Sequence, residues 1–152
     1  MKGYYNLTDT LYNFLITDAL VNQVTKGSLD KITNAKKDMY PLVHVMINGA
    51  KIEGSSVVYN ISILAMDLVD YSNADPVNLY YGNDNLDDVL HNTFLICQRF
   101  LESARRGSMS DLLFSVENDA ADLEPFVERF TDDVAGWSMT FDVTTVNDMT
   151  IC

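Results

Sequence analysis

The chain has 152 residues, of which 47% are hydrophobic, so it is long enough to bury a core and too apolar for intrinsic disorder. Ten Lys and Arg residues stand against 22 Asp and Glu residues, and the net charge of −12 argues against binding to nucleic-acid backbones or anionic membranes. No apolar run approaches the ~20 residues of a membrane span, and the N-terminus shows no leader pattern. We therefore expect one soluble domain over residues 1–152 that stays in the compartment where it is made.

The negative charge is concentrated in the second half of the chain. Residues 1–76 carry a net charge of −2 and residues 77–152 a net charge of −10. The two cysteines, Cys97 and Cys152, cannot form a disulfide framework, and neither they nor the two histidines have a zinc-ligand spacing. We expect a reducing compartment, no metal and no cofactor.

The N-terminal segment predicts a helix over residues 7–25, followed by Gly27 as a stop signal. Apolar residues recur there at helical spacing: Leu7, Leu11, Phe14, Leu15, Leu20 and Val24. Residues 29–38 are polar and hold three lysines, which predicts a surface loop.

A β-hairpin is predicted next, from strands over residues 40–47 and 57–70. The turn signal is Asn48-Gly49, with Glu53-Gly54 as a second candidate. In the second strand Tyr59, Ile61, Ile63 and Ala65 alternate with Asn60 and Ser62, which indicates one buried and one polar face.

The second half predicts a long loop over residues 71–83, a helix that ends with Arg105 and Arg106, and a second hairpin. The hairpin strands are expected over residues 126–130 and 137–143, with a turn over residues 132–136. The expected fold class is thus α+β in the order α-β-β-α-β-β, a four-stranded antiparallel sheet with the helices packed on one face.

Few residues point to catalysis. His44 lies within an apolar strand pattern, which favours a structural histidine, and His91 follows Asp87 and Asp88 at helical spacing, which favours an ion pair. The segment 83–88 lacks the order of a calcium loop and suits a helix cap.

No nucleophile, zinc-protease or phosphate-loop motif is present. Asp132 and Asp133 suit a hairpin turn, and Glu124 and Glu128 suit solvated strand positions. We therefore expect no enzyme and no catalytic residues.

Tyrosines outside the core periodicity are typical of interfaces between proteins. They cluster near the N-terminus, at Tyr4, Tyr5 and Tyr12, and in the long loop. The candidate interface residues are Lys31, Lys36, Lys37, Tyr71, Tyr80 and Tyr81.

Five segments resemble small neck and tail-completion proteins of tailed bacteriophages. They are residues 124–130 (EPFVERF), 135–143 (AGWSMTFDV), 147–152 (NDMTIC), 40–46 (YPLVHVM) and 61–70 (ISILAMDLVD). The similarity spans most of the chain and consists of packing patterns, with no motif that assigns a role to an individual residue.

Proteins of the tail-terminator type share this element order and assemble as rings between the head-side connector and the tail. The resemblance implies a structural ring subunit, a hexamer or a dodecamer, that contacts other neck, portal-side and tail proteins of the virion. Such a protein assembles in the host cytoplasm, and DNA passes through its channel without specific binding. Acids of residues 77–152 are then candidates to line the channel, and which of them do so is unknown at this stage.

Two other functions fit the sequence. An acidic DNA mimic that occupies a basic protein would also carry a strong negative charge. A small ligand-binding module or enzyme would need a cavity that holds His44 or a converged pair of carboxylates.

Overall fold

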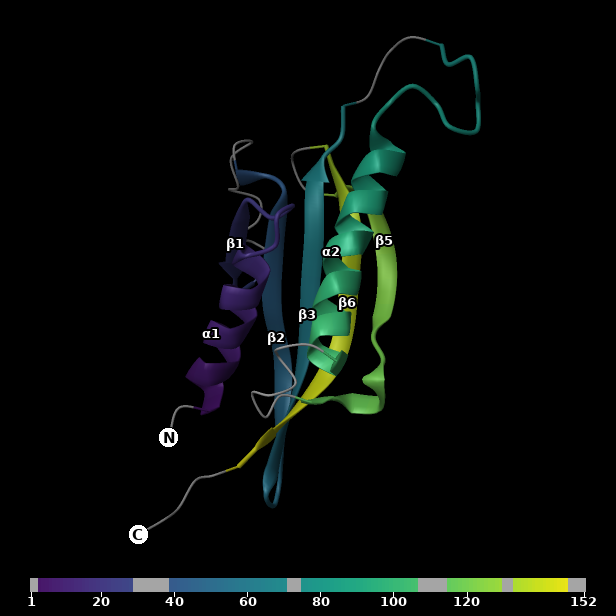
Figure 1. Ribbon diagram of the computed structural model, residues 1–152. Coiled ribbons are helices and arrows are strands. Elements are labelled where there is room, and N and C mark those ends of the chain that lie inside the picture. The colour runs from purple at the N-terminus through teal and green to yellow at the C-terminus, as the bar shows by residue number, and fades with distance from the viewer. Residues whose placement is uncertain (1–2, 29–38, 71–74, 107–114, 130–132, 148–152) are drawn as a thin grey trace.

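Two helices cover one face of a six-stranded mixed sheet (Figure 1). The computed structural model describes residues 3–28, 39–70, 75–106, 115–129 and 133–147. Its elements are α1 (Gly3–Ile16), β1 (Gln23–Lys26), β2 (Leu42–Glu53), β3 (Ser56–Leu68), α2 (Leu86–Arg106), β4 (Ser115–Val116), the short 3-10 helix η4 (Glu117–Asp119), β5 (Asp122–Arg129) and β6 (Val134–Val146). The chain is α+β, as expected.

The sheet has the strand order β1-β2-β3-β6-β4, and β5 pairs with β6 on the same edge as β4. β1 runs parallel to β2, whereas all other pairs are antiparallel. The expected four-stranded antiparallel sheet is therefore wrong in detail, because it lacks β1 and β4. The expectation that both helices pack on one face is confirmed.

The first helix is shorter than the predicted range of residues 7–25. It ends at Ile16, and the Asp18 side chain then accepts a hydrogen bond from the backbone N–H of Leu20 at 2.9 Å. Such a local side-chain bond competes with the helical ladder and turns the chain. Val24, which fits the helical period, lies instead in β1, where the alternation of a four-residue strand buries it.

The first hairpin turns at Gly54, where φ is +59°, and not at Asn48-Gly49. The register of β2 against β3 shifts between Ile47 and Gly49, so Asn48 forms a β-bulge. The second candidate turn signal was therefore the correct one. As a result β2 and β3 continue as a long hairpin beyond the predicted turn.

The core lies between the sheet and the helices. Odd-numbered residues of β3 and β6 face it, as the alternation predicted, and α1 and α2 bury one stripe each. Its largest fully buried side chains include Leu11, Leu15, Ile61, Ile63, Ile96, Phe100 and Met139. Full burial of one such side chain contributes about 1.5–3 kcal/mol to folding.

Neither α1 nor α2 packs on the opposite face of the sheet, which we call the helix-free face; the short 3-10 helix η4 borders it. Near the start of β2 it is apolar, with Leu42, Leu64 and Met66 buried together. Further along, hydrogen bonds join a polar ladder, which consists of Asn48, Asn60, Ser62, Thr140 and Asp142. The sheet therefore has one face that packs against α1 and α2, and a second face that is apolar and buried at one end and polar at the other.

Gly136 was expected in a turn, but it lies inside β6 opposite Met66 of β3. A Cβ atom at this position would stand 1.9 Å from the carbonyl oxygen of Ala65. The next residue, Trp137, donates its indole N–H to the carbonyl of Leu90 at 2.9 Å. Because Gly136 has no side chain, β6 can approach β3 closely at this position, beneath α2.

Gly136→Ala is expected to lower the free energy of unfolding by about 1–3 kcal/mol, because the neighbouring strand has to move away. Urea unfolding followed by circular dichroism measures this change. Gly49→Ala is the matched control, since a Cβ atom there meets nothing within 4 Å, and its effect should stay below about 1 kcal/mol. Equal effects of the two substitutions would contradict the close-approach explanation.

Candidate functional site

His44 is fully buried in β2, and both of its ring nitrogens have partners in the fold. Nε2 donates to the carbonyl of Gly27 at 2.9 Å, and Nδ1 accepts from the hydroxyl of Thr25 at 2.7 Å. Both partners lie at β1, so the imidazole joins the parallel strand to β2. His44 is therefore placed to hold the sheet edge, and it is not among the residues that line the hollows beside Tyr12, Arg99 and Asp142.

The acidic segment 83–88 forms the N-terminal cap and the first turn of α2. Asp84 accepts a hydrogen bond from the N–H of Leu86, and Asn85 accepts one from the N–H of Asp70 at the end of β3. The capping interpretation therefore holds, with Asp84 as the side-chain cap. The ion pair expected between His91 and Asp87 or Asp88 does not form among the described residues, where all three side chains are exposed.

Cys97 lies in the core side of α2 and is fully buried. Burial raises the pKa of its thiol to about 12, because the thiolate would lose its hydration. At neutral pH the thiol is therefore protonated and shielded, which does not suit a nucleophile. Cys152 lies outside the described residues.

Three carboxylates line one hollow of about 220 Å³ on the helix-free face: Glu117, Asp122 and Asp142. Asn60 donates to Asp142 at 2.8 Å, and Thr144 donates to Glu117. Glu117 and Asp122 are exposed to solvent. Nowhere in the described ranges do three His, Cys, Asp or Glu side chains form a group that could hold a metal ion.

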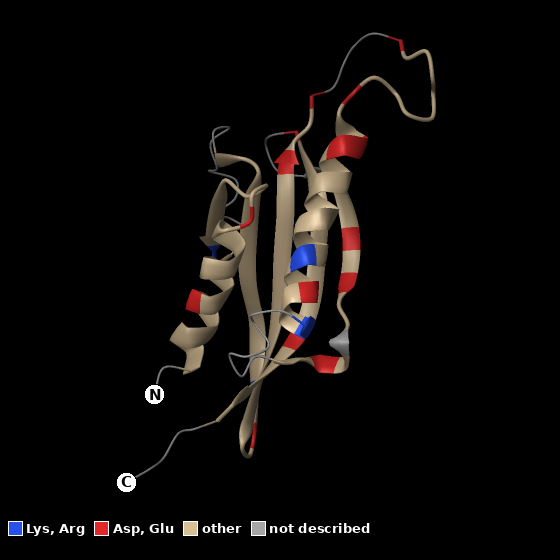
Figure 2. Cartoon of the chain, in the orientation of Figure 1, with Lys and Arg blue, Asp and Glu red and all other residues tan. Residues whose placement is uncertain are grey.

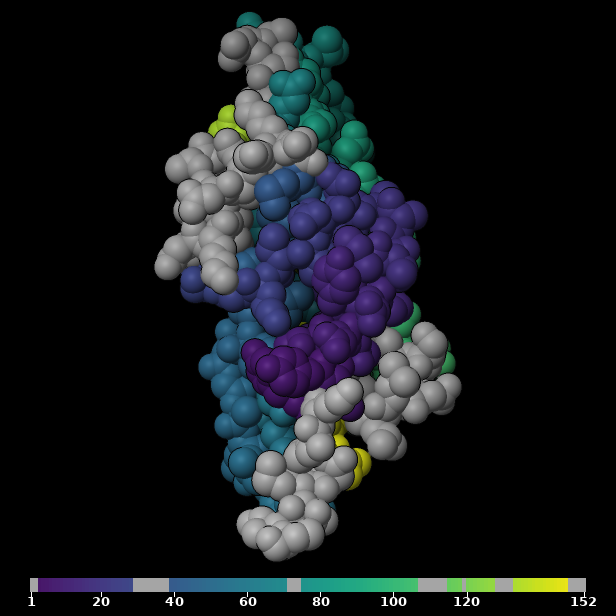
Figure 3. Space-filling view, turned by 90° about the vertical axis from the view of Figure 1, so that its left-hand side faces the viewer, coloured from purple at the N-terminus to yellow at the C-terminus, as the bar shows by residue number. Residues whose placement is uncertain are grey.

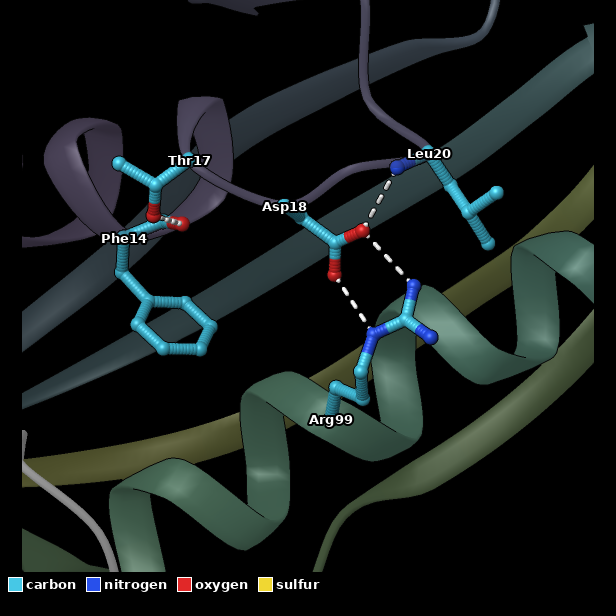
Figure 4. A network of polar contacts seen from close by, with 5 residues as sticks. All are labelled: Phe14, Thr17, Asp18, Leu20 and Arg99. Atoms are coloured by element: carbon cyan, nitrogen blue, oxygen red, sulfur yellow. Dashed lines mark hydrogen bonds and ion pairs between the residues drawn. The ribbon is translucent and has the colours of Figure 1, made fainter.

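The contact between the end of α1 and α2 depends on an ion pair (Figure 4). The guanidinium of Arg99 donates to both carboxylate oxygens of Asp18, at 2.7 and 2.9 Å. The Asp18 side chain is only 5% exposed, and its hydrogen bonds raise the pKa of Arg99 further above the neutral range. Next to this pair the ring of Phe14 packs edge-on against Phe100 at 5.6 Å. The pair therefore ties α1 to α2.

A group of highly exposed apolar side chains lies in the loop between β3 and α2. Val77, Leu79, Tyr80 and Tyr81 are 107%, 87%, 86% and 65% exposed. We call residues 77–82 the aromatic loop; it extends beyond the end of the sheet and the start of α2 (Figure 1). A monomer rarely exposes such a group of apolar side chains without a binding role.

A second apolar surface lies on the opposite edge, between α1 and β1 (Figure 3). We call it the α1–β1 groove; its volume is about 280 Å³, and it is lined by Thr8, Asp9, Leu11, Tyr12, Val24, Thr25, Lys26 and Val45. Leu11, Val24 and Val45 are buried at its base, whereas Tyr12 is half exposed. Tyr5, seven residues before Tyr12 on α1, is 68% exposed. Helical spacing places these two tyrosines on one face of α1.

The structure describes two of the six interface residues predicted from the sequence. Tyr80 and Tyr81 lie side by side at the aromatic loop, with ring centroids 5.0 Å apart in an edge-on arrangement. Lys31, Lys36, Lys37 and Tyr71 lie outside the described residues, as does the C-terminal segment 148–152.

Sequence reasoning missed the aliphatic part of these surfaces. Val77 and Leu79 belong to the aromatic loop, and Ile52, which is 74% exposed, lies at the tip of the first hairpin. A run of Pro, Val, Asn and Leu in a loop has no periodicity that distinguishes a surface position from a buried one. The only signal was the loop length, which was interpreted as a sign of function.

Charge is distributed unevenly over the sheet (Figure 2). Asp122 and Glu124 of β5 pair in register with Thr140 and Ser138 of β6, so they point to the same helix-free face as Asp142. At the other edge Lys26 of β1 is exposed and forms no ion pair within the described part of the chain.

No family model matches this chain, and no curated protein matches it significantly. Among the described residues no helix is long and apolar enough to cross a membrane.

Arg99→Met should lower the free energy of unfolding by about 1–2 kcal/mol, since it leaves the nearly buried carboxylate of Asp18 without its cation. Thermal or urea unfolding measures the change. Arg106→Met is the matched control: that side chain is 74% exposed and lies 3.8 Å from Glu102, so its loss should cost less than about 1 kcal/mol. An Arg99→Met variant as stable as the parent would show that the ion pair with Asp18 does not stabilise the contact between α1 and α2.

Proposed function

We propose that the chain is a structural ring subunit of the neck or tail of a tailed bacteriophage, of the tail-terminator or head-to-tail connector type. The observation that carries this proposal is the pair of separate apolar surfaces, the aromatic loop and the α1–β1 groove. Surfaces at different places on one subunit support head-to-tail contacts, and such contacts close into rings when the rotation between subunits permits.

The polar face of the sheet suits a channel. Asp122, Glu124 and Asp142 point to this helix-free side. A wall of carboxylates repels the phosphates of DNA and lets the duplex pass without binding to it. In the proposed ring this face is turned to the lumen, and α1 and α2 are turned outward.

Both ends of the molecule extend beyond the packed layers. The aromatic loop lies at one end, and the hairpin tip with the exposed Ile52 lies at the other (Figure 1). A neck subunit has to contact a head-side connector on one side and a tail protein on the other. The two extensions are the proposed contacts with these proteins in the virion, after assembly in the host cytoplasm.

Native mass spectrometry of the purified chain over a concentration series, at low and at moderate salt, tests the proposal. We expect one discrete six-fold or twelve-fold species, because apolar contacts close the ring and persist when salt screens charges. A monomer at every concentration and salt would contradict the self-assembling ring. Pull-down of basic proteins by that monomer would then favour the acidic-mimic function.

A further inference from the structure

Asn48 is the only asparagine of the chain that precedes a glycine. An asparagine loses its side-chain amide when the backbone nitrogen of the next residue attacks the amide carbon. A glycine in that next position hinders the attack least, because it has no side chain and a permissive backbone. Asn48 is also exposed to solvent, so water and hydroxide can reach it. These two features make Asn48 the asparagine most open to this reaction.

The backbone at this step lies outside the regular ladder of the sheet. The register of β2 against β3 shifts between Ile47 and Gly49, so Asn48 is the extra residue of the β-bulge. A bulge leaves its extra residue unpaired and disrupts the ladder locally. A Cβ atom at Gly49 would meet nothing within 4 Å, so no neighbour crowds this residue. A regular strand would hold both residues extended, whereas the bulge and the glycine leave room for a ring to close.

The side-chain amide of Asn48 is held with its nitrogen next to a hydroxyl group. Nδ2 donates to Oδ1 of Asn60 and to Oγ of Ser62, each at 2.8 Å. Ser62 is only 7% exposed, and its hydroxyl lies 3.0 Å from that of Thr140. A hydroxyl donates as well as accepts, so Ser62 can give a proton to the nitrogen when that nitrogen becomes an amine leaving group. Such proton donation by a positioned side chain is general acid catalysis.

We propose that Asn48 is a self-modification site that converts to aspartate and isoaspartate in the folded protein, with Ser62 as the proton donor. The backbone nitrogen of Gly49 forms a bond to Cγ of Asn48 and loses its proton to water. The bond between Cγ and Nδ2 then breaks, and the nitrogen leaves as ammonia with a proton that Ser62 supplies and recovers from water. A water molecule opens the resulting cyclic imide at either carbonyl, which gives aspartate or isoaspartate.

The product changes the polar end of the helix-free face. A carboxylate at position 48 only accepts hydrogen bonds, so the two bonds donated to Asn60 and Ser62 are lost. Asn60 in turn donates to Asp142 at 2.8 Å, so a single side chain separates the new charge from an existing carboxylate. Isoaspartate also lengthens the backbone of β2 at the bulge. The modification therefore loosens the polar ladder and makes this face more acidic, and it does not depend on the proposed ring.

Ageing of the purified full chain at mildly alkaline pH tests the proposal. Folded protein and protein unfolded in guanidinium chloride are incubated side by side, and peptide mapping by tandem mass spectrometry measures the fraction of Asn48 that has lost its amide. We expect Asn48 to convert before any other asparagine of the folded chain, at a rate no lower than in the unfolded chain. Slower conversion of Asn48 in the folded protein than in the unfolded chain would overturn the proposal, since the strand would then protect this residue.

Variants of Ser62 test the proton donor. Ser62→Ala removes the hydroxyl, and we expect the rate at Asn48 in the folded protein to fall by about tenfold, with no change in the unfolded chain. Ser62→Thr is the matched control, because it keeps the hydroxyl and should keep the rate of the parent. Equal rates at Asn48 in folded Ser62→Ala and in the folded parent would overturn the role of Ser62.

Two further variants complete the design. Gly49→Ala hinders the attacking nitrogen itself, so it should slow conversion in the folded and in the unfolded chain alike. Thr140→Val removes the hydroxyl beside Ser62 at a half-buried position, and it should slow conversion only in the folded protein. It provides a second test of the hydroxyl pair if Ser62→Ala does not fold, and a folded rate equal to that of the parent would count against this pair. Circular dichroism melting checks that each variant is folded during the incubation.

Discussion

The pairing of β3 with its two neighbours is the constraint on which the rest of the structure depends. Every residue of β3 has a partner in β6, and nearly all have one in β2. Because side chains alternate along a strand, this double pairing assigns each residue to one of two faces. Odd positions such as Ile61 and Ile63 build the core with the helices, and even positions such as Asn60 and Ser62 join the polar ladder. A shift of this pairing register by one residue would place the core residues on the polar face and the polar residues in the core.

Within the described part of the chain, this assignment places the main exposed apolar surfaces at the margins of the molecule. The core side is covered by α1 and α2, and the polar side is satisfied by hydrogen bonds within the ladder. The exposed apolar side chains include those of the aromatic loop at one end, the hairpin tip at the other, and the tyrosine face of α1 beside its groove. In the proposed ring, such a subunit would make its contacts along its edges and ends, and the acidic face would be left for the channel.

The sequence predicted the elements that have a long and regular pattern. α2 begins and ends where the caps and the terminal arginines indicated, and the alternation in β6 gave its faces correctly. β1 was missed because four residues are too few to reveal a period, and Val24 also fits the helix before it. Gly136 was assigned to a turn because the reason for a glycine there, the carbonyl of Ala65, lies 71 positions away in the chain. Likewise, the tyrosines of the long loop were identified by residue type, whereas the α1–β1 groove was missed because it is formed by tertiary structure.

The central claim is a closed ring whose helix-free sheet face lines the channel. Electron cryomicroscopy of the purified assembly, averaged with its rotational symmetry, tests this claim most directly. We expect a central channel bounded by the sheet, with the density rods of α1 and α2 on the outer rim. Rings whose inner wall is formed by the two helices, or open filaments in place of rings, would contradict it.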